Sequence, residues 1–497
     1  MFDFKGLIDA LMRRARDEQD FGPTATQMMA ELPRNETLAA LTEIVKALAA
    51  LNRNPRVGLK ERYRAVANFD DKARPLAQLL IAVHRGEETV DGIQPRQAMP
   101  SLLACWKELA SAYKLCLKQH AQSPSPRFAH DAELITLRAV SYYAEQAKWA
   151  YLRYFEAEPR LWRSLNRLYQ IADTAGFAQR PIARYPGDAP ISVATLYAHA
   201  MLLELAEPAR RRPEEIWLLD QALSHWVARV PVEKIIRPRE QTYAVNLDEP
   251  APPVKLRRNM VGERYRYLST EPLAQFLAEL ADAVRGGARP AELATKDEQL
   301  AAHIPDLLDD LALVYSREGQ SRSRRSERRK HEQAVLALTG LERIHHALGA
   351  AGSTAEWENW TQADESASGV GAHYKARYND QLAVGEVFAY RHDTHLTLSV
   401  VRRLHKSRDA QVKVGAERLG PNPVAVTLDS AGYLQPALYC AESPLGARLL
   451  VLPRAGGAEG TEYLLAAGGK RYRIRLGAPH EVLPDYVLAG FTVLERG

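Results

Sequence analysis

The first 230 residues carry apolar side chains at the three- and four-residue spacing that is typical of amphipathic helices. In residues 35–52, NETLAALTEIVKALAALN, this spacing is seen at Leu38, Leu41, Ile44 and Leu48. Similar segments follow one another, separated by Pro, Gly, Asn and Asp. The pattern predicts helices that pack as antiparallel hairpins.

The pattern changes twice towards the C-terminus. Prolines at 250, 252 and 253 interrupt residues 231–317, where TYAVNL and RYRYL predict short strands ahead of two further helices. From Ala334 the apolar spacing shifts towards two, as in KRYRIRL, where Ile474 and Leu476 alternate with basic residues. Turn residues recur there at the spacing found in β-sandwiches and barrels.

We therefore predict a multidomain α + β chain with an α region followed by a β region, not an interleaved parallel fold. The predicted parts are an all-α helical-hairpin domain (1–230), a small α+β middle module (231–317), an Arg-rich linker (318–330), an antiparallel β-barrel (331–422) and a second small β domain (423–497).

Composition narrows the class of protein. The 497 residues are 46% hydrophobic and 26% charged, as in ordinary soluble globular proteins. The net charge is +5, and residues 317–330 alone hold seven Lys and Arg against two Glu, which equals the whole excess. A general nucleic-acid-binding surface is not indicated.

Targeting and redox features point to the cytoplasm. Residues 1–21 contain acidic side chains and no long apolar run, so neither a signal peptide nor membrane insertion is expected. Cys105, Cys116 and Cys440 have no metal-ligand spacing and are expected to be buried, reduced thiols.

Two short stretches carry the candidate chemistry. RSRRSERRK, residues 322–330, contains two overlapping Arg-x-x-x-Arg pairs just ahead of an expected strand, and WTQADESASGVG, residues 360–371, contains Asp-x-Ser-x-x-Gly. The candidate ligand-binding residues are Arg324, Arg325, Arg328, Arg329, Asp364, Ser366 and Gly369.

With these two motifs, residues 320–420 resemble the PilZ domain family, bacterial receptors for the second messenger cyclic di-GMP. VGEVFAYR, LTLSVVRRLH and AQVKVGAERLG resemble the middle and closing strands of its barrel. The gap between the arginines and Asp364 is longer than the family pattern, and we interpret ERIHHALG, residues 342–349, as an inserted helix between the first two strands. Which arginine pair faces the ligand stays open.

The resemblance implies a cyclic di-GMP-binding effector with no enzymatic activity and no other cofactor. A guanidinium can bind phosphate or the O6/N7 edge of guanine bidentately, and a carboxylate such as Asp364 can accept from the opposite guanine edge. Ser366 would bind the same base or the turn backbone, and Gly369 would permit a positive φ. We expect the arginine segment to become ordered when the ligand binds.

Two alternatives remain: a nucleic-acid-binding adaptor that uses the same arginines, and a scaffold with a degenerate PilZ domain that binds only protein. The basic run lacks the interleaved aromatic residues of a stacking platform, which disfavours nucleic acid. We find no P-loop, no GxSxG and no HExxH, and the histidine pairs His345-His346 and His392/His395 lack further metal ligands.

The helical domain is the expected site for a protein partner. Its most aromatic stretch, residues 148–169, includes Trp149, Tyr151, Tyr154 and Trp162. These rings exceed one helical stripe, so most are expected in a helix–helix core, and the remainder could dock a partner.

Overall fold

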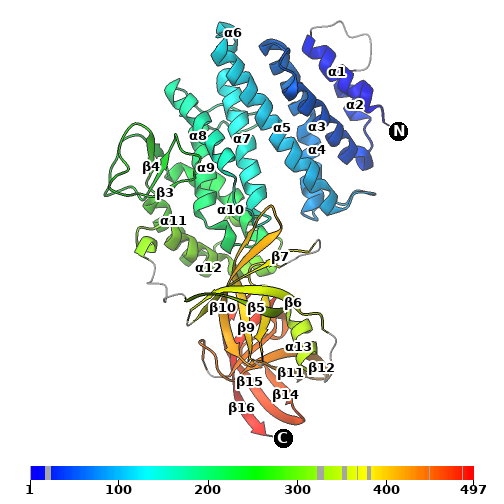
Figure 1. Cartoon of the computed structure of the whole chain (residues 1–497), viewed down its shortest axis with the longest axis vertical. Coiled ribbons are helices and arrows are strands. Elements are labelled where there is room, and N and C mark those ends of the chain that lie inside the picture. The colour runs from blue at the N-terminus through cyan, green and yellow to red at the C-terminus, as the bar shows by residue number, and fades with distance from the viewer. Residues whose placement is uncertain are drawn as a thin grey trace.

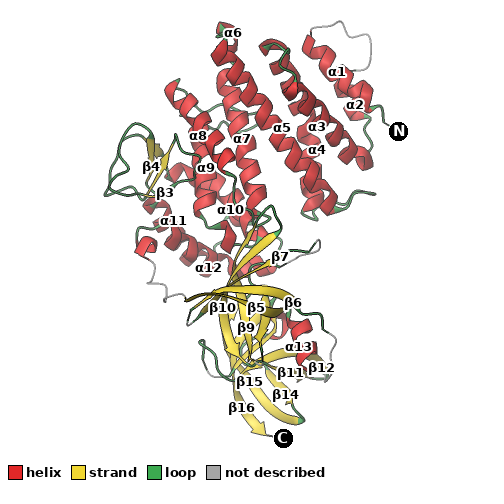
Figure 2. Ribbon diagram, in the orientation of Figure 1, coloured by secondary structure: helices red, strands yellow, loops and turns green. Residues whose placement is uncertain are grey.

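The computed structural model of the chain describes residues 2–16, 24–321, 329–349, 355–366, 368–377, 382–393, 395–446, 448–483 and 485–496. Helices gather at the N-terminal end of the molecule and two β-barrels lie at the other end, with the C-terminus on the last strand (Figures 1 and 2). An α region followed by a β region was predicted, and the structure confirms that order.

The N-terminal part contains the helices α1 (Phe4–Arg16), α2 (Ala25–Ala30), α3 (Thr37–Arg53), α4 (Leu59–His84), α5 (Pro95–Gln122), α6 (Pro126–Ala129), α7 (Ala132–Tyr151), α8 (Pro159–Thr174), α9 (Val193–Leu205) and α10 (Pro213–Trp226). Their apolar stripes meet in one hydrophobic core; Leu41, Ile44 and Leu48 of α3 are fully buried in it. No helix in the described part of the chain is long and apolar enough to cross a membrane.

A buried carboxylate ties α4, α5 and α7 together. Asp70 accepts hydrogen bonds from the hydroxyls of Tyr113, Tyr142 and Tyr185, and Arg138 Nη1 lies 3.4 Å from it. Burial raises the pKa of Asp70, while Arg138 and the three tyrosines oppose that effect. A buried charge with this many partners fixes how the helices pack.

Residues 232–315 continue the helical core. The short strands β1 (Val232–Glu233), β2 (Tyr243–Asn246), β3 (Val254–Lys255) and β4 (Tyr265–Leu268) form a sheet in the order β1-β4-β2-β3, followed by α11 (Glu271–Arg285) and α12 (Glu298–Tyr315). Leu277, Leu308 and Tyr315 belong to the same hydrophobic cluster as α1–α10. We therefore treat residues 2–315 as one helical region.

The first barrel is closed and contains β5 (Arg329–Thr339), β6 (Glu358–Glu365), β7 (Gly369–Lys375), β8 (Val387–His392), β9 (His395–Lys406) and β10 (Gln411–Pro421) in the order β10-β7-β6-β5-β8-β9. Its interior holds alternate residues of each strand, including Val335, Trp360 and Phe388. The inserted helix expected between the first two strands is confirmed as α13 (Leu341–Gly349).

The second barrel is also closed, with β11 (Val424–Ser430), β12 (Tyr433–Cys440), β13 (Leu449–Pro453), β14 (Glu462–Ala467), β15 (Lys470–Val482) and β16 (Tyr486–Arg496) in the order β11-β12-β13-β16-β15-β14. Ile474 and Leu476 point into its core, as the alternation in KRYRIRL predicted.

The two barrels share an apolar interface. Residues from β5, β8 and β9 that face away from the first barrel's interior pack against α13 and the second barrel, among them Val387 and Leu398. Arg402 crosses between the barrels: it donates to Glu417 of the first barrel at 2.8 Å and forms a two-pronged ion pair with Glu481 of the second.

One tyrosine of the helical region enters the first barrel. Tyr154 follows the end of α7, has φ 61°, and is buried in the barrel's core cluster. Its carbonyl accepts from Lys406 N–H at 2.8 Å, and its hydroxyl accepts from Val384 N–H at 3.2 Å. The connection between α7 and α8 is therefore fixed to the barrel surface at this point.

Candidate functional site

The Asp-x-Ser-x-x-Gly motif forms the tight connection between β6 and β7. Ser366 closes it, because Gly369 N–H donates to Ser366 Oγ at 3.1 Å and Ser366 N–H donates to the Gly369 carbonyl at 2.8 Å. The Ser366 hydroxyl therefore binds the turn backbone, and its expected contact with a guanine base stays a prediction.

Gly369 does not adopt the positive φ expected from the sequence, because it is already the first residue of β7. Its missing side chain matters for packing instead. A Cβ at this position would lie 3.3 Å from both the Ala416 carbonyl oxygen and Ser366 Oγ. The glycine therefore lets the turn lie close against β10.

Asp364 lies opposite a second glycine that the sequence analysis did not single out. A register shift after Gln362 pairs Asp364 with Gly371 of β7. A Cβ on Gly371 would lie 2.7 Å from Asp364 Oδ1, so the carboxylate rests directly over the glycine backbone. The sequence signal was the second glycine in SGVG, two residues after the motif ends.

The end of the arginine run lies beside this turn. Arg329 is the first residue of β5, is exposed, and pairs in register with Glu365, while Lys330 pairs with Asp364. Arg324, Arg325 and Arg328 lie outside the described residues. The strand register thus places the described end of the basic motif next to the acidic motif.

Arg418 of β10 supports the turn from the other side, a role that the sequence analysis missed. It donates to Glu365 Oε2 at 2.6 Å, to the Ser366 carbonyl at 3.3 Å and to the Tyr390 hydroxyl at 3.2 Å. These contacts occupy Glu365 and leave the Asp364 side of the turn facing a cleft.

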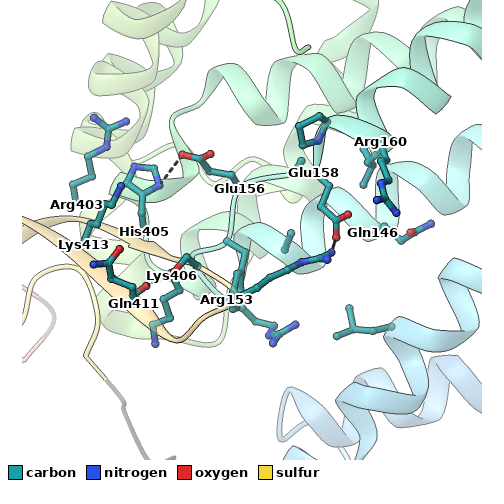
Figure 3. A pocket seen from close by; sticks show the side chains of 18 of the residues that line it. Gln146, Arg153, Glu156, Glu158, Arg160, Arg403, His405, Lys406, Gln411 and Lys413 are labelled. Atoms are coloured by element: carbon teal, nitrogen blue, oxygen red, sulfur yellow. Dashed lines mark hydrogen bonds and ion pairs between the residues drawn. The ribbon is translucent and has the colours of Figure 1, made fainter. Parts of the chain in front are cut away.

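That cleft lies between the first barrel and the helical region and has a volume of about 1500 Å³. Asp364 and Gly371 line it from β6 and β7 (Figure 3 shows the neighbouring side chains). The basic residues lining it are, from the helical region, Lys107, Lys114, Arg153, Arg160 and Arg163, and, from the barrel, Arg403, Lys406, Arg408 and Lys413, with the histidines His373 and His405. The acidic residues of the described lining are Glu156, Glu158 and Asp364.

Strand register explains why the barrel wall is flat and basic. Gly371 pairs with Gly415, and Gly415 pairs with Arg403, so these residues share the outer face with Asp364. The next outward-facing row contains His373, Lys413 and His405. A planar ligand could approach the two glycines while cations and one carboxylate surround it.

Two ion pairs cross the cleft. His405 Nδ1 of β9 lies 3.4 Å from Glu156 Oε1, and Arg408 pairs with Glu158. Burial lowers the pKa of His405, and Arg403 and Lys413 lower it further, while Glu156 opposes them. These contacts join the barrel to the connection between α7 and α8.

In the described part of the chain, no three His, Cys, Asp or Glu side chains are grouped as metal ligands. The cleft instead offers an excess of cations with hydrogen-bond donors, which is the chemistry of an anion site.

Comparison with known proteins bears on the helical region. Residues 23–238 match the family model described as "Cyclic-di-GMP receptor FimW, N-terminal domain". The match covers less than half of the chain and ends ahead of both barrels. No curated protein sequence matches the chain. The helical region is therefore similar to the FimW N-terminal domain, and the barrels are interpreted from their own residues.

Proposed function

We propose that this protein is a cyclic di-GMP-binding effector and that its first barrel is a PilZ-like domain. The observation that carries the proposal is the strand register, which brings the described end of the Arg-x-x-x-Arg run next to the Asp364–Gly369 turn. The similarity of the helical region to the N-terminal domain of a cyclic di-GMP receptor supports it independently.

The cleft has the chemistry that this ligand requires. Cyclic di-GMP presents two phosphate charges and two guanine edges; arginines can bind either, and Asp364 can accept from the guanine edge that carries N1–H and N2–H. The volume of about 1500 Å³ exceeds the roughly 300–1,000 Å³ of common small-molecule pockets, which suits a dinucleotide or a stacked pair.

In this proposal the barrel binds the nucleotide and the helical region transmits occupancy to a protein partner. The α7–α8 connection is the path for that signal, because Tyr154 and the two ion pairs already fix it to the barrel wall. The ligand can shift the equilibrium between two arrangements of the barrel and the helical region only by the difference between its affinities for them.

Isothermal titration calorimetry of cyclic di-GMP into the full chain tests the proposal. We expect micromolar or tighter binding in the wild type, and at least about tenfold weaker binding in Asp364→Ala and in the combined Arg324/Arg325/Arg328/Arg329→Ala variant, because each removes charged contacts to the ligand.

The matched control removes three arginines from the second barrel: Arg471→Ala, Arg473→Ala and Arg475→Ala on β15 should leave the affinity unchanged. Flat heats with folded wild type would overturn the proposal. An affinity that falls steeply with salt and extends to unrelated oligonucleotides would point to the nucleic-acid adaptor instead.

A further inference from the structure

The wall of the cleft that faces the barrel belongs to the helical region, and it is held in place. The buried Tyr154 side chain anchors the α7–α8 connection to the first barrel, and Phe155 forms a parallel bridge with Lys406. Because α8 begins at Pro159, its first turn opens on the cleft, with Arg160 and Arg163 among the lining residues. Figure 3 shows Arg160 on this side and Arg403 and Lys413 on the barrel side.

Three arginines of this wall have no acidic partner in the described part of the chain. Among the residues that the structure describes, none places a carboxylate within 4.0 Å of the guanidinium of Arg153, Arg160 or Arg163. Arg153 is half-buried, with its guanidinium 4.7 Å from the centre of the Phe155 ring. The half-buried guanidinium of Arg153 favours an anion from outside the chain, and the exposed Arg160 and Arg163 add positive charge to the same wall.

The first turn of α8 adds to the attraction. The positive end of its helix dipole lies at the lining residues Glu158, Pro159 and Arg160. In the structure, two carboxylates of the chain itself partly neutralise the basic lining of the cleft. Glu158 pairs with Arg408 of the barrel, and Glu156 pairs with His405.

We infer that the helical region supplies the second half of the ligand site: Arg153, Arg160 and Arg163 bind the phosphates of a nucleotide that rests on the barrel at Asp364 and the two glycines, and Glu156 and Glu158 compete with those phosphates for His405 and Arg408. This inference rests on the proposed function and describes how the barrel and the helical region share the same site.

The sharing has a direct consequence for signalling. A ligand that bridges the walls loosens the Glu156 and Glu158 ion pairs and replaces them with its own contacts to α8. Occupancy therefore changes the forces on α8, which packs on α7 and α9 within the core of the helical region. No movement of the barrel as a whole is needed.

Calorimetry of cyclic di-GMP with two opposed full-chain variants tests the inference. The Arg160→Ala/Arg163→Ala variant removes two cations and should weaken binding about tenfold, because these arginines attract the phosphates. The Glu156→Gln/Glu158→Gln variant removes the competing acids and should strengthen binding about threefold, because these acids compete with the phosphates. Changes in opposite directions are not expected from a general loss of folding.

Arg167→Ala is the matched control, because Arg167 is an exposed residue of α8 that binds Gln170 at 2.6 Å and does not line the cleft. Wild-type binding that is unchanged in both double variants would overturn this inference and leave the proposed function standing. Flat heats in the wild type would overturn the proposed function and this inference with it.

Discussion

The two barrels of this protein have the same number of strands and both close, yet they treat surface charge differently. On β15 of the second barrel, Arg473 and Arg475 both bind Glu462, at 2.8 and 2.6 Å. On the first barrel, Arg403 and Lys413 face the cleft, and no described carboxylate lies within ion-pair distance of them. The second barrel thus neutralises Arg473 and Arg475 within the chain, whereas Arg403 and Lys413 of the first barrel have no described counter-charge.

The ends of the barrels differ as well. The first barrel takes Tyr154 of the helical region into its core, whereas Tyr433 and Leu434, at the β11–β12 tip of the second barrel, are 73% and 64% exposed. The comparison teaches that barrel closure alone defines no site. The cleft lies where a second part of the chain covers a basic, glycine-lined face of the first barrel.

The largest effect is expected from breaking the contact that makes the first barrel different. Tyr154→Ala removes a buried ring and the acceptor for Val384 N–H, while the left-handed backbone conformation stays equally strained because alanine also has a Cβ. We expect the free energy of unfolding to fall by about 3–5 kcal/mol. Denaturant unfolding, read by hydrogen exchange in the first barrel, measures this change.

The matched substitution in the second barrel is Tyr433→Ala, which should change the free energy of unfolding by no more than about 0.5 kcal/mol because the ring is mostly exposed. Tyr154→Phe keeps the ring and should cost about 1 kcal/mol for the lost hydrogen bond. Equal effects of the two alanine substitutions would contradict the role of Tyr154 as the anchor.

A smaller effect is expected from adding a side-chain atom to the flat face of the first barrel. Gly371→Ala places a Cβ 2.7 Å from Asp364 Oδ1, so the carboxylate must move. If Asp364 binds the guanine edge, cyclic di-GMP affinity should fall about tenfold, which corresponds to about 1.4 kcal/mol. Calorimetry measures the affinity, and thermal unfolding checks that the barrel stays folded.

Gly477→Ala in the second barrel is the control, since its Cβ would lie 3.4 Å from the nearest atom, the Gly490 carbonyl oxygen. We expect no change in affinity there. A Gly371→Ala variant that binds as tightly as wild type would show that the position of Asp364 does not matter to the ligand.

The parts of the fold that follow from local periodicity could be predicted from the sequence. Ile474 and Leu476 alternate with basic residues and are buried as expected, because burial of one sheet face imposes a period of two. The helix at 342–349 was predicted because the gap between the arginines and Asp364 is longer than the PilZ family pattern. The Asp364–Gly369 motif was found as a connection between strands because acid, serine and glycine suit turns.

The parts that depend on contacts between distant segments could not be predicted. Tyr154 was grouped with the aromatic helix–helix core, but α7 ends at Tyr151 and the ring enters a barrel that begins at Arg329. Tyr315 donates to the Leu202 carbonyl, which joins the middle segment to the helical core. Neither contact can be predicted from the spacing of nearby apolar residues. The helical wall of the cleft was missed for the same reason.

The smallest predicted effect is a dependence of stability and ligand affinity on pH that originates in the first barrel and not in the second. Burial lowers the pKa of His405 below its usual value near 6.5, and Arg403 and Lys413 lower it further, while Glu156 opposes them. The unfolded chain then binds the extra proton first, and the free energy of unfolding falls as the pH drops below about 6.5. A phosphate in the cleft opposes the positive charges of Arg403 and Lys413 and raises the pKa of His405.

Cyclic di-GMP binding should therefore take up a proton, and affinity should rise about two- to threefold as the pH falls from 8 to 6. Calorimetry in two buffers of different ionisation enthalpy measures the proton uptake. His405→Gln should abolish it. His345→Gln should not, because His345 lies on α13 with Nε2 3.0 Å from the Val426 carbonyl oxygen of the second barrel, although burial lowers its pKa too. The same proton uptake in His405→Gln as in wild type would place the phosphates away from this wall of the cleft.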